Sequence, residues 1–375
     1  MSRNKQSIQK YFEQRKSFCN FFYNYIEDKD YFNMLNDYIK DNKLLEKNNF
    51  VHILRFISNV CNNHSRYQEF YEKIEYILIF YEDEIKQTFL NHEIFDIFKN
   101  NKLILLCLFK NKIIEFDKNI SKTILDEIDQ NGTKYCHFFL PEIREFIEKD
   151  TITKIEKELL DYDQKIFENF EMKRNLGEND SYICTLIRQD LVEEFISYIN
   201  RFNISLTIKI NVSLFETNQF LIENEPTLIE YAAFFGSIQI FQYMQFNNVE
   251  LTPSLWYYAI HSNNPEFIHI LENNEIEPDD KTYLKCYEEA IKCHHNDIAN
   301  YIEENLLKQK EIKNFNEIIA NVSFHYYNYL YFPSNFFQSF VFYNLCKYNY
   351  THIVEKMLKI QKDVIENVRV FLSIF

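Results

Sequence analysis

The sequence predicts an all-α protein, a solenoid of stacked helix pairs that follows a helical N-terminal region. Three observations lead to this fold class. Only 3 Gly and 6 Pro occur in 375 residues, so few residues interrupt helical stretches. Apolar residues make up 46% of the chain and recur at helical spacing over most of its length. Finally, a pattern of two short helices around a tight turn returns along the C-terminal half.

The N-terminal region begins with a predicted helical hairpin. Residues 1–45 show the spacing of amphipathic helices, and Phe12, Phe22 and Tyr25 are expected to face inward. We interpret this hairpin as a separate element, followed by helix pairs that are less regular than those further along the chain.

Further helices are predicted downstream of the hairpin. Within residues 65–89, the side chains of Phe70, Ile74, Ile77 and Phe80 share one helical face, with charged residues opposite. Two shorter apolar helices then meet at residues 99–101, where two consecutive Asn residues favour a turn. This arrangement is again a helix pair.

The predicted domain boundary falls within the strongly charged stretch 148–180, which contains Gly177. It separates a helical N-terminal region, 1–175, from a repeat region, 176–375. The clearest repeats span residues 227–308, and weaker ones lie near 180–200 and 338–360.

The stretch TLIEYAAFFGSIQIFQYM, residues 227–244, is the clearest repeat. A first helix contains Ala232, Gly236 occupies the turn, and a second helix follows. The same pattern returns twice downstream, with a small residue at the first-helix position and a turn residue four positions later. The first-helix positions are Ala232, Ala259 and Ala290, and the turn positions are Gly236, Asn263 and His294. A small residue there lets neighbouring helices approach closely, so we interpret it as structural.

Each of these repeats closes with an Asn followed by an apolar residue. Asn is the residue that, after Gly, most readily adopts the left-handed conformation that ends a helix. We therefore expect the Asn to take that conformation and the apolar residue to fold back over the helix. The pairs are Asn247 with Val249, Asn274 with Ile276, and Asn305 with Leu307.

The weaker repeats follow the same template. Cys184 is placed at the small-residue position of the first, and Asn349 at the turn of the last. Between the repeats, β-branched residues alternate near 205–212, which predicts a short hairpin or an extended insertion.

The repeat of residues 227–244 resembles an ankyrin repeat, in which Thr-Pro-Leu-His-x-Ala-Ala precedes a Gly turn and an apolar second helix. The residues that match are Thr227, Ile229, Ala232, Ala233, Gly236, Ile240 and Met244. The chain departs from that pattern where Glu230 replaces the motif His and where Asn replaces the closing Gly. The whole chain is similar to divergent ankyrin-like proteins of trichomonad protists, a domain family of unknown function. The resemblance implies an ankyrin-like solenoid and no known activity.

The net charge and the hydropathy of the chain exclude several classes of function. A formal net charge of −15 argues against nucleic acid and anionic membranes as partners, and favours a protein partner, which could be basic. The longest apolar run, 103–109, is far shorter than the roughly 18 residues of a membrane span. The N-terminus lacks an apolar signal core, so we expect a soluble cytoplasmic protein.

The strongest candidate for chemistry is the cluster of Cys286, Cys293, His294, His295 and Asp297. Cys and His are zinc ligands, so one hypothesis is a metal-dependent enzyme that uses Cys293, His294, His295 and Asp297. The favoured interpretation is structural, because the two His residues fall at a turn and the two Cys residues at packing positions. No catalytic spacing or Gly-rich phosphate loop is present, so we expect no enzyme activity, no cofactor and no metal.

The favoured function is that of a non-enzymatic protein–protein interaction scaffold, with a partner that the sequence does not identify. Ankyrin-like arrays bind through first helices and the loops between repeats, which here carry several acidic and aromatic residues. Trp256 is favoured as a core residue, and would be a binding hot spot if exposed. A further hypothesis is a truncated family member without retained function, because the chain ends in ENVRVFLSIF. The candidate surface comprises Glu230, Trp256, Tyr257, Glu275, Glu277, Asp279 and Asp280.

Overall fold

The computed structural model describes residues 3–64, 67–126, 134–309 and 312–360. These residues are helical with connecting turns and contain no β-strand, which confirms the all-α prediction. The chain forms two compact units. The first combines Met1–Asn59 with Thr282–Phe375, and the second spans Val60–Lys281. These units therefore group the residues differently from the division predicted near residue 175.

The first unit draws helices from both ends of the sequence. Its N-terminal part contributes α1, η1, α2 and α3, although the last turn of α3 belongs to the second unit. The bounds are α1 Arg3–Glu27, η1 Lys29–Tyr31, α2 Phe32–Asp41, α3 Lys47–Asn63, α20 Leu284–Lys292, α21 Asn296–Asn305, α22 Phe315–Tyr326, η3 Tyr329–Tyr331 and α23 Ser339–Lys347. Residues 351–360 are helical as well.

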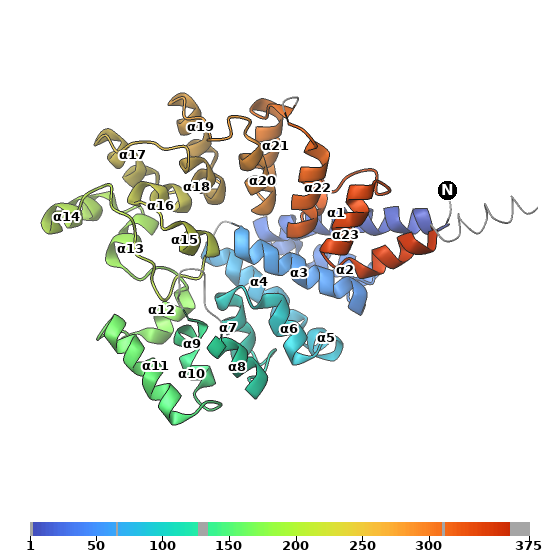
Figure 1. The fold of residues 1–375 in the computed structure, drawn as a ribbon, viewed down its shortest axis with the longest axis horizontal. Coiled ribbons are helices and arrows are strands. Elements are labelled where there is room, and N and C mark those ends of the chain that lie inside the picture. The colour runs from blue at the N-terminus through green and yellow to red at the C-terminus, as the bar shows by residue number, and fades with distance from the viewer. Residues whose placement is uncertain (1–2, 65–66, 127–133, 310–311, 361–375) are drawn as a thin grey trace, which may run out of the picture. The chain divides into compact units, whose positions relative to one another are not determined.

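The N-terminal hairpin is not a separate element. Phe12, Phe22 and Tyr25 are buried as predicted. However, Phe12 of α1 stacks on Phe336, with ring centroids 4.1 Å apart. Figure 1 shows the blue α1 beside the orange α22, whose Phe324 ring lies 6.3 Å from that of Phe12. The apolar face of α1 is therefore covered within its unit by α3, by α22 and by the segment that follows η3. The apolar stretch 366–375 that motivated the truncation hypothesis lies outside the described residues.

The second unit contains the remaining helices. The bounds are α4 Gln68–Phe80, α5 Glu82–Thr88, α6 Asn91–Phe98, α7 Lys102–Lys110, α8 Lys118–Asp126, α9 Tyr135–Phe138, α10 Leu140–Ile143, α11 Lys149–Tyr162, α12 Phe170–Leu176, α13 Tyr182–Arg188, α14 Val192–Phe202, α15 Gln219–Asn224, α16 Leu228–Phe235, α17 Ile238–Phe246, α18 Leu255–Ser262 and α19 Pro265–Asn273. The predicted pair that meets at residues 99–101 is present as α6 and α7. One expected core residue, Phe80, is instead 42% exposed.

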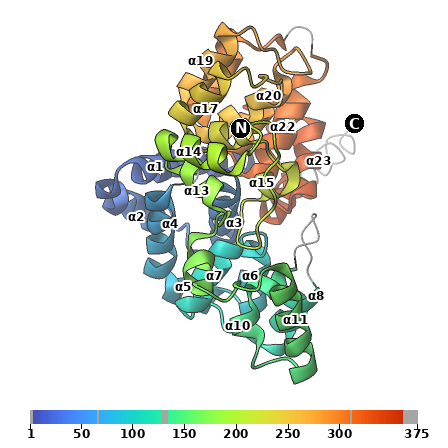
Figure 2. The same cartoon turned by 90° about the vertical axis from the view of Figure 1, so that its left-hand side faces the viewer.

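Three helix pairs of the second unit stack side by side: α13–α14, α16–α17 and α18–α19 (Figure 1, Figure 2). First helices pack against first helices, with α16 between α13 and α18. The Oγ of Ser237 donates to the carbonyl of Ile187 at 2.5 Å, which links the turns of the first two pairs. In the same turn, both carboxylate oxygens of Asp190 accept amide N–H groups at the start of α17, from Gln239 at 3.0 Å and Ile240 at 2.9 Å. Neighbouring pairs are therefore joined by polar contacts as well as by apolar packing.

The turns inside the pairs have the predicted left-handed backbone. The φ angles are +74° at Gly236, +54° at Asn263 and +59° at His294. The first weaker repeat shows the same geometry at Asp190, with φ +51°. In the clearest repeat, the N–H of Ser237 donates to the carbonyl of Ala232, and the equivalent bond here runs from the N–H of Leu191 to the carbonyl of Leu186. The register of this repeat therefore differs by two residues from the prediction. Leu186, not Cys184, therefore occupies the Ala232 position.

The closing Asn residues act differently from the prediction. Asn247 and Asn274 have φ angles of −89° and −94°, so neither is left-handed. The left-handed residue is the next one, Asn248 or Glu275. The Asn side chain instead bonds to the carbonyl one turn earlier, as Asn247 Nδ2 does to Tyr243 at 2.8 Å. The apolar residues do fold back, since the backbone N–H groups of Val249, Ile276 and Leu307 bond to carbonyls of the preceding helix.

The β-branched stretch near 205–212 is extended and does not form a hairpin. The N–H of Ile210 donates to the carbonyl of Pro226 at 2.7 Å, and that of Leu228 donates to Ile208 at 3.3 Å. An isolated antiparallel bridge joins Lys209 to Thr227. The insertion thus fixes the chain that enters α16.

The first testable consequence concerns the turn that retained Gly. A Cβ at Gly236 would have no heavy atom within 4 Å, so Gly236→Ala should introduce backbone strain alone. We expect a loss of about 1–2 kcal/mol of stability. The reverse change, Asn263→Gly, should raise stability by less than about 1 kcal/mol, because relief of strain is partly offset by a freer unfolded chain. Urea unfolding followed by circular dichroism measures the free energy of unfolding of both variants. Changes of equal size and the same sign in Gly236→Ala and Asn263→Gly would contradict a role for left-handed backbone strain at these turns.

A second prediction concerns acid stability of the first unit. His52 is buried against Tyr350, with stacked rings 4.7 Å apart. Burial lowers its pKa well below the usual value, and Arg15, Arg55 and His352 act in the same direction. The unfolded chain therefore binds the proton more readily than the folded one, so stability should be greatest above about pH 6.5 and fall as the pH decreases.

His52→Phe should flatten this pH dependence, because Phe preserves the stacked ring and cannot titrate. The urea concentration at the midpoint of unfolding is measured at several pH values from neutral to mildly acidic. His92→Phe is the matched control, because His92 is exposed on α6. This substitution should leave the dependence of the urea midpoint on pH as in the wild type. An unchanged slope in His52→Phe would show that other groups dominate acid unfolding.

Candidate functional site

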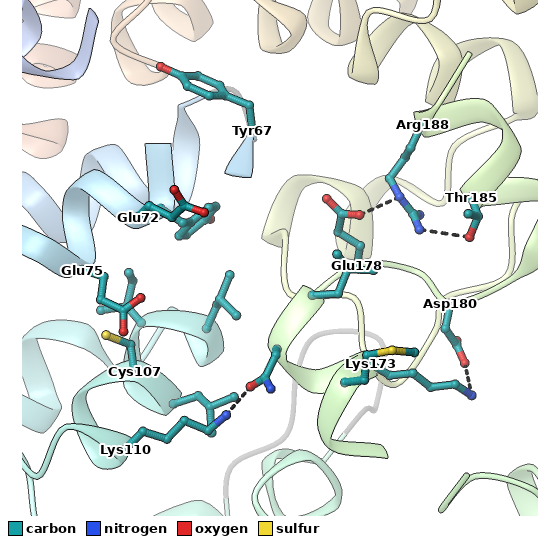
Figure 3. Close-up of a pocket in the computed structure, with 17 residues that line it drawn as sticks. Tyr67, Glu72, Glu75, Cys107, Lys110, Lys173, Glu178, Asp180, Thr185 and Arg188 are labelled. Carbon is teal, nitrogen blue, oxygen red and sulfur yellow. Dashed lines mark hydrogen bonds and ion pairs between the residues drawn. The ribbon is translucent and has the colours of Figure 1, made fainter. Parts of the chain in front are cut away.

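One cavity of the second unit is a groove between two walls. Helices α4 and α7 form one wall, and α12, α13 and the linking residues 177–181 form the other (Figure 3). The groove encloses about 820 Å³. This volume falls within the range of ligand pockets, which is roughly 300–1,000 Å³.

The groove combines an apolar floor with exposed apolar rims. Ile104 and Leu106 of α7 are buried beneath it. On the rims, the side chains of Met172, Leu176 and Tyr67 are 64%, 54% and 41% exposed. Exposed apolar side chains that gather around a groove are typical of a binding surface, whereas scattered ones are not.

The wall formed by α12 and α13 carries basic residues that are already paired. Lys173 Nζ lies 2.8 Å from Asp180 Oδ2, and Arg188 Nε lies 2.6 Å from Glu178 Oε2. Arg188 also donates to the hydroxyl of Tyr231 at 2.8 Å. Figure 3 shows both ion pairs within this wall. These cations are therefore held by neighbouring carboxylates and add little net positive charge to the groove.

The α4 part of the opposite wall is acidic, whereas α7 adds Lys110, whose Nζ lies 3.9 Å from Glu171 Oε2. Glu72 and Glu75 lie three residues apart on α4 and both line the groove (Figure 3). Glu75 accepts a hydrogen bond from the neutral amide of Asn111 at 3.2 Å. Burial, together with the adjacent Glu75 carboxylate, raises the pKa of the Cys107 thiol to about 12. Cys107 thus remains a thiol at neutral pH, and a thiolate is the reactive form of cysteine.

Gly177 allows the two walls of the groove to lie close together. It ends α12 with φ +66°, and its carbonyl accepts hydrogen bonds from both the amide and the hydroxyl of Thr217. A Cβ at this position would lie 3.0 Å from Thr217 Oγ1 and 3.2 Å from Leu103 Cδ1. Within the stretch 148–180, which the sequence predicts as a domain junction, residues from Met172 to Asp180 line this groove.

The structure gives structural roles to two residues of the predicted binding surface. Trp256 is fully buried, and its indole N–H donates to the carbonyl of Ile276 at 2.7 Å, so it belongs to the core and is not a surface hot spot. The carboxylate of Glu230 accepts from the amide of Thr227 at 2.8 Å in a capping box at the start of α16. It also accepts from Ser254 at 2.6 Å. Tyr257 is half-buried on α18.

The other predicted surface residues follow α19. Glu275, Glu277 and Asp279 are exposed, and Asp280 is half-buried. Glu275 has a left-handed backbone, φ +55°, so part of its role is to end the helix. None of these residues lines the groove described above.

The Cys/His cluster in the first unit is occupied by structural contacts. His294 Nδ1 lies 2.6 Å from the hydroxyl of Tyr23, and its Nε2 lies 2.9 Å from the carbonyl of Tyr326. Because a carbonyl only accepts, Nε2–H is the donor of that bond, and both ring nitrogens are engaged. Cys293 is buried, which raises its pKa well above the usual value, while Asp297 is exposed in the first turn of α21. Among the described residues, Cys293, His294, His295 and Asp297 do not bring ligand atoms together around one point.

Sequence reasoning missed the groove entirely. Its lining residues come from four helices, and the apolar ones have the same helical spacing as core residues. The only signal was the charge density of 148–180, which contains Lys173, Glu178 and Asp180 of the second wall.

Comparisons with protein-family models, with curated proteins and with solved structures find no match for this chain. Within the described ranges, no helix combines the length and apolar character needed to cross a membrane. The site must therefore be interpreted from its own geometry.

Gly177→Ala tests the close approach of the walls. The substitution adds left-handed strain and a methyl group too near Thr217 and Leu103, so we expect a loss of about 2–5 kcal/mol. The loss should exceed that of Gly236→Ala, which has strain but no crowding. Urea midpoints of the two variants provide the comparison. A smaller effect at residue 177 than at residue 236 would show that the wall moves freely.

Proposed function

We propose that this protein is a non-enzymatic protein-binding scaffold, and that the groove between α4, α7, α12 and α13 holds a segment of its partner. The segment carries at least one Lys or Arg flanked by apolar side chains. The observation that carries the proposal is the pairing of exposed apolar rims with an acidic α4 wall in one groove.

The apolar component supports binding of side chains from another protein. Burial of Met172 and Leu176 by a partner would remove apolar surface from water at roughly 25 cal/mol per Å². Both side chains are more than half exposed in this chain. Flexible Met side chains also adapt to differently shaped partners.

The charge component supports a basic residue in the partner. The cations of the α12–α13 wall are held by Glu178 and Asp180, and Lys110 of α7 lies 3.9 Å from Glu171. Glu72 and Glu75 add two carboxylates to the α4 side of the groove. Arg is the favoured partner residue, because its planar fork can bond two oxygens while its stem covers apolar surface. The formal net charge of −15 acts in the same direction over longer distances.

The helix pairs are the frame on which this groove depends. We infer that they are divergent ankyrin-like repeats, because their left-handed turn residues follow that pattern, as do the small first-helix residues Ala232, Ala259 and Ala290. The exposed Glu275, Glu277 and Asp279 form a second acidic surface at a connection between repeats, which suits the same basic class of partner. A cytoplasmic location is part of this proposal.

Peptide selection tests the proposal directly. A random peptide library displayed on phage is selected on the immobilised full-length protein, and a selected peptide is then titrated by fluorescence polarisation. We expect enrichment of peptides with Lys or Arg flanked by apolar residues. Glu72→Lys with Glu75→Lys should weaken the binding of such a peptide at least about tenfold, because like charges then face each other.

The matched control is Glu193→Lys with Glu194→Lys, which makes the same charge change at exposed positions of α14. This control should bind within about twofold of the wild type at physiological salt, where screening over the Debye length removes distant effects. Enrichment of peptides without cations, or equal loss in both double variants, would contradict the groove as the binding site.

A further inference from the structure

Arg15 is a buried charge in the first unit. The side chain lies on α1 and is 0% exposed. Its Nη2 donates to Asn49 Oδ1 at 2.8 Å, and its guanidinium carbon lies 4.5 Å from the ring centre of Tyr11. The Nε and Nη1 atoms have no hydrogen-bond partner among the described residues. Within the described residues, two donors of a permanent cation are therefore unsatisfied.

Arg174 in the second unit shows how this chain normally accommodates a buried guanidinium. It is 1% exposed and lies 2.6 Å from Glu142 and 2.7 Å from Glu171. It also donates to the carbonyl of Phe138 at 2.8 Å. Arg15, by contrast, has no carboxylate within ion-pair distance in the described part of the chain.

Other polar groups beside Arg15 are unsatisfied too. The hydroxyls of Tyr11 and Tyr329 and the Nδ1 of His52 are buried without a hydrogen-bond partner among the described residues. The Tyr11 and His52 rings lie 6.5 Å apart. Burial raises the pKa of both tyrosines and the positive charge of Arg15 opposes that rise, so the guanidinium acts on both hydroxyls. The ring of Tyr327 lies 5.9 Å from that of His52 and 6.3 Å from that of Tyr329, so the unsatisfied groups lie around one aromatic region of the unit.

Without a bound ligand, this arrangement of unsatisfied polar groups lowers the stability of the folded protein. Arg keeps its proton at any pH the protein meets, so the charge cannot be removed by titration. A buried charge without a counter-ion is strongly unfavourable, and each unsatisfied buried donor adds to the cost. Yet α1 brings Arg15 into the centre of the unit, where Phe12 and Phe336 fix the helix in place.

We propose that Arg15, Tyr11, Tyr329 and His52 form a binding site for a small monovalent anion of the halide class, for which chloride is the natural candidate. The Nε–H and Nη1–H of Arg15 and the two hydroxyls are the donors. The Nδ1 of His52 is a fifth donor when it carries the ring proton. The ion supplies the negative charge that the described residues do not.

Charge and enclosure select this class of anion. One guanidinium balances one negative charge, whereas a phosphate dianion would leave a second buried charge unpaired. The site is enclosed by aromatic rings with almost no exposure, including Tyr350 and Tyr329 at 0%. A monatomic ion needs donors from any direction, which suits hydroxyl groups and a guanidinium edge better than it suits the fixed geometry of an oxyanion.

The test uses thermal unfolding of the full-length protein in sodium chloride and in sodium gluconate at constant ionic strength. The unfolding midpoint should rise with chloride and then saturate, since a ligand that binds only the folded state stabilises it by mass action. Tyr329→Phe removes one hydroxyl and should weaken the apparent chloride affinity by roughly 2- to 10-fold. Arg15→Met should abolish the chloride-specific part of the response.

One control separates the site from general salt effects. Arg201→Met changes an exposed arginine on α14 and should retain the wild-type chloride response. If Arg15→Met does not fold, Tyr329→Phe and Tyr11→Phe decide the question, because each removes only an oxygen. Wild-type chloride dependence in both hydroxyl variants would overturn the proposal. Crystals grown in bromide should show an anomalous peak beside Arg15, and a peak only elsewhere would overturn it as well.

Discussion

The whole fold depends on a backbone constraint at the turns. In the helix pairs α13–α14, α16–α17, α18–α19 and α20–α21, the first helix reverses into its partner through one residue with a positive φ angle. Gly236 satisfies this constraint without strain, but it is the only Gly at these turns. At the others a residue with a side chain adopts the left-handed conformation, at a cost of about 1–2 kcal/mol each that packing must offset. The turn residues are Asp190, Gly236, Asn263, His294, Tyr327 and Asn349.

This constraint explains which parts of the fold the sequence could predict. Gly236, Asn263 and Asn349 belong to residue types that favour left-handed turns, so local spacing was sufficient to place them, and His294 followed from the register. Tyr327 has no such preference, and the sequence offers no signal for its turn. The two-residue error at Leu186 has the same origin, because Asp190 is a weak turn signal and Cys184 looked like a small residue in the right place.

Long-range packing was not predictable for a different reason. Phe12 shows only that one face of α1 is buried, and nothing in its neighbourhood specifies Phe336, more than 300 residues away. The groove has the same difficulty, since Met172 and Leu176 have the spacing of core residues and yet are exposed. Periodicity identifies which side chains share a face, but only the tertiary arrangement determines whether another helix covers that face.

Charge links the two proposed sites. The net charge of −15 describes the chain as a whole, but each site depends on which cations have a carboxylate nearby. In the groove, Lys173 and Arg188 are paired with carboxylates of their own wall, so the proposed preference for a basic partner rests on the carboxylates of α4. In the first unit, Arg15 lies among neutral tyrosines and histidine, so an excess of acidic residues elsewhere cannot compensate it. Coulomb energy falls with distance and with solvent screening, whereas a buried charge needs a counter-ion in direct contact. An acidic protein can therefore favour a basic partner at its surface and still require an anion in its core.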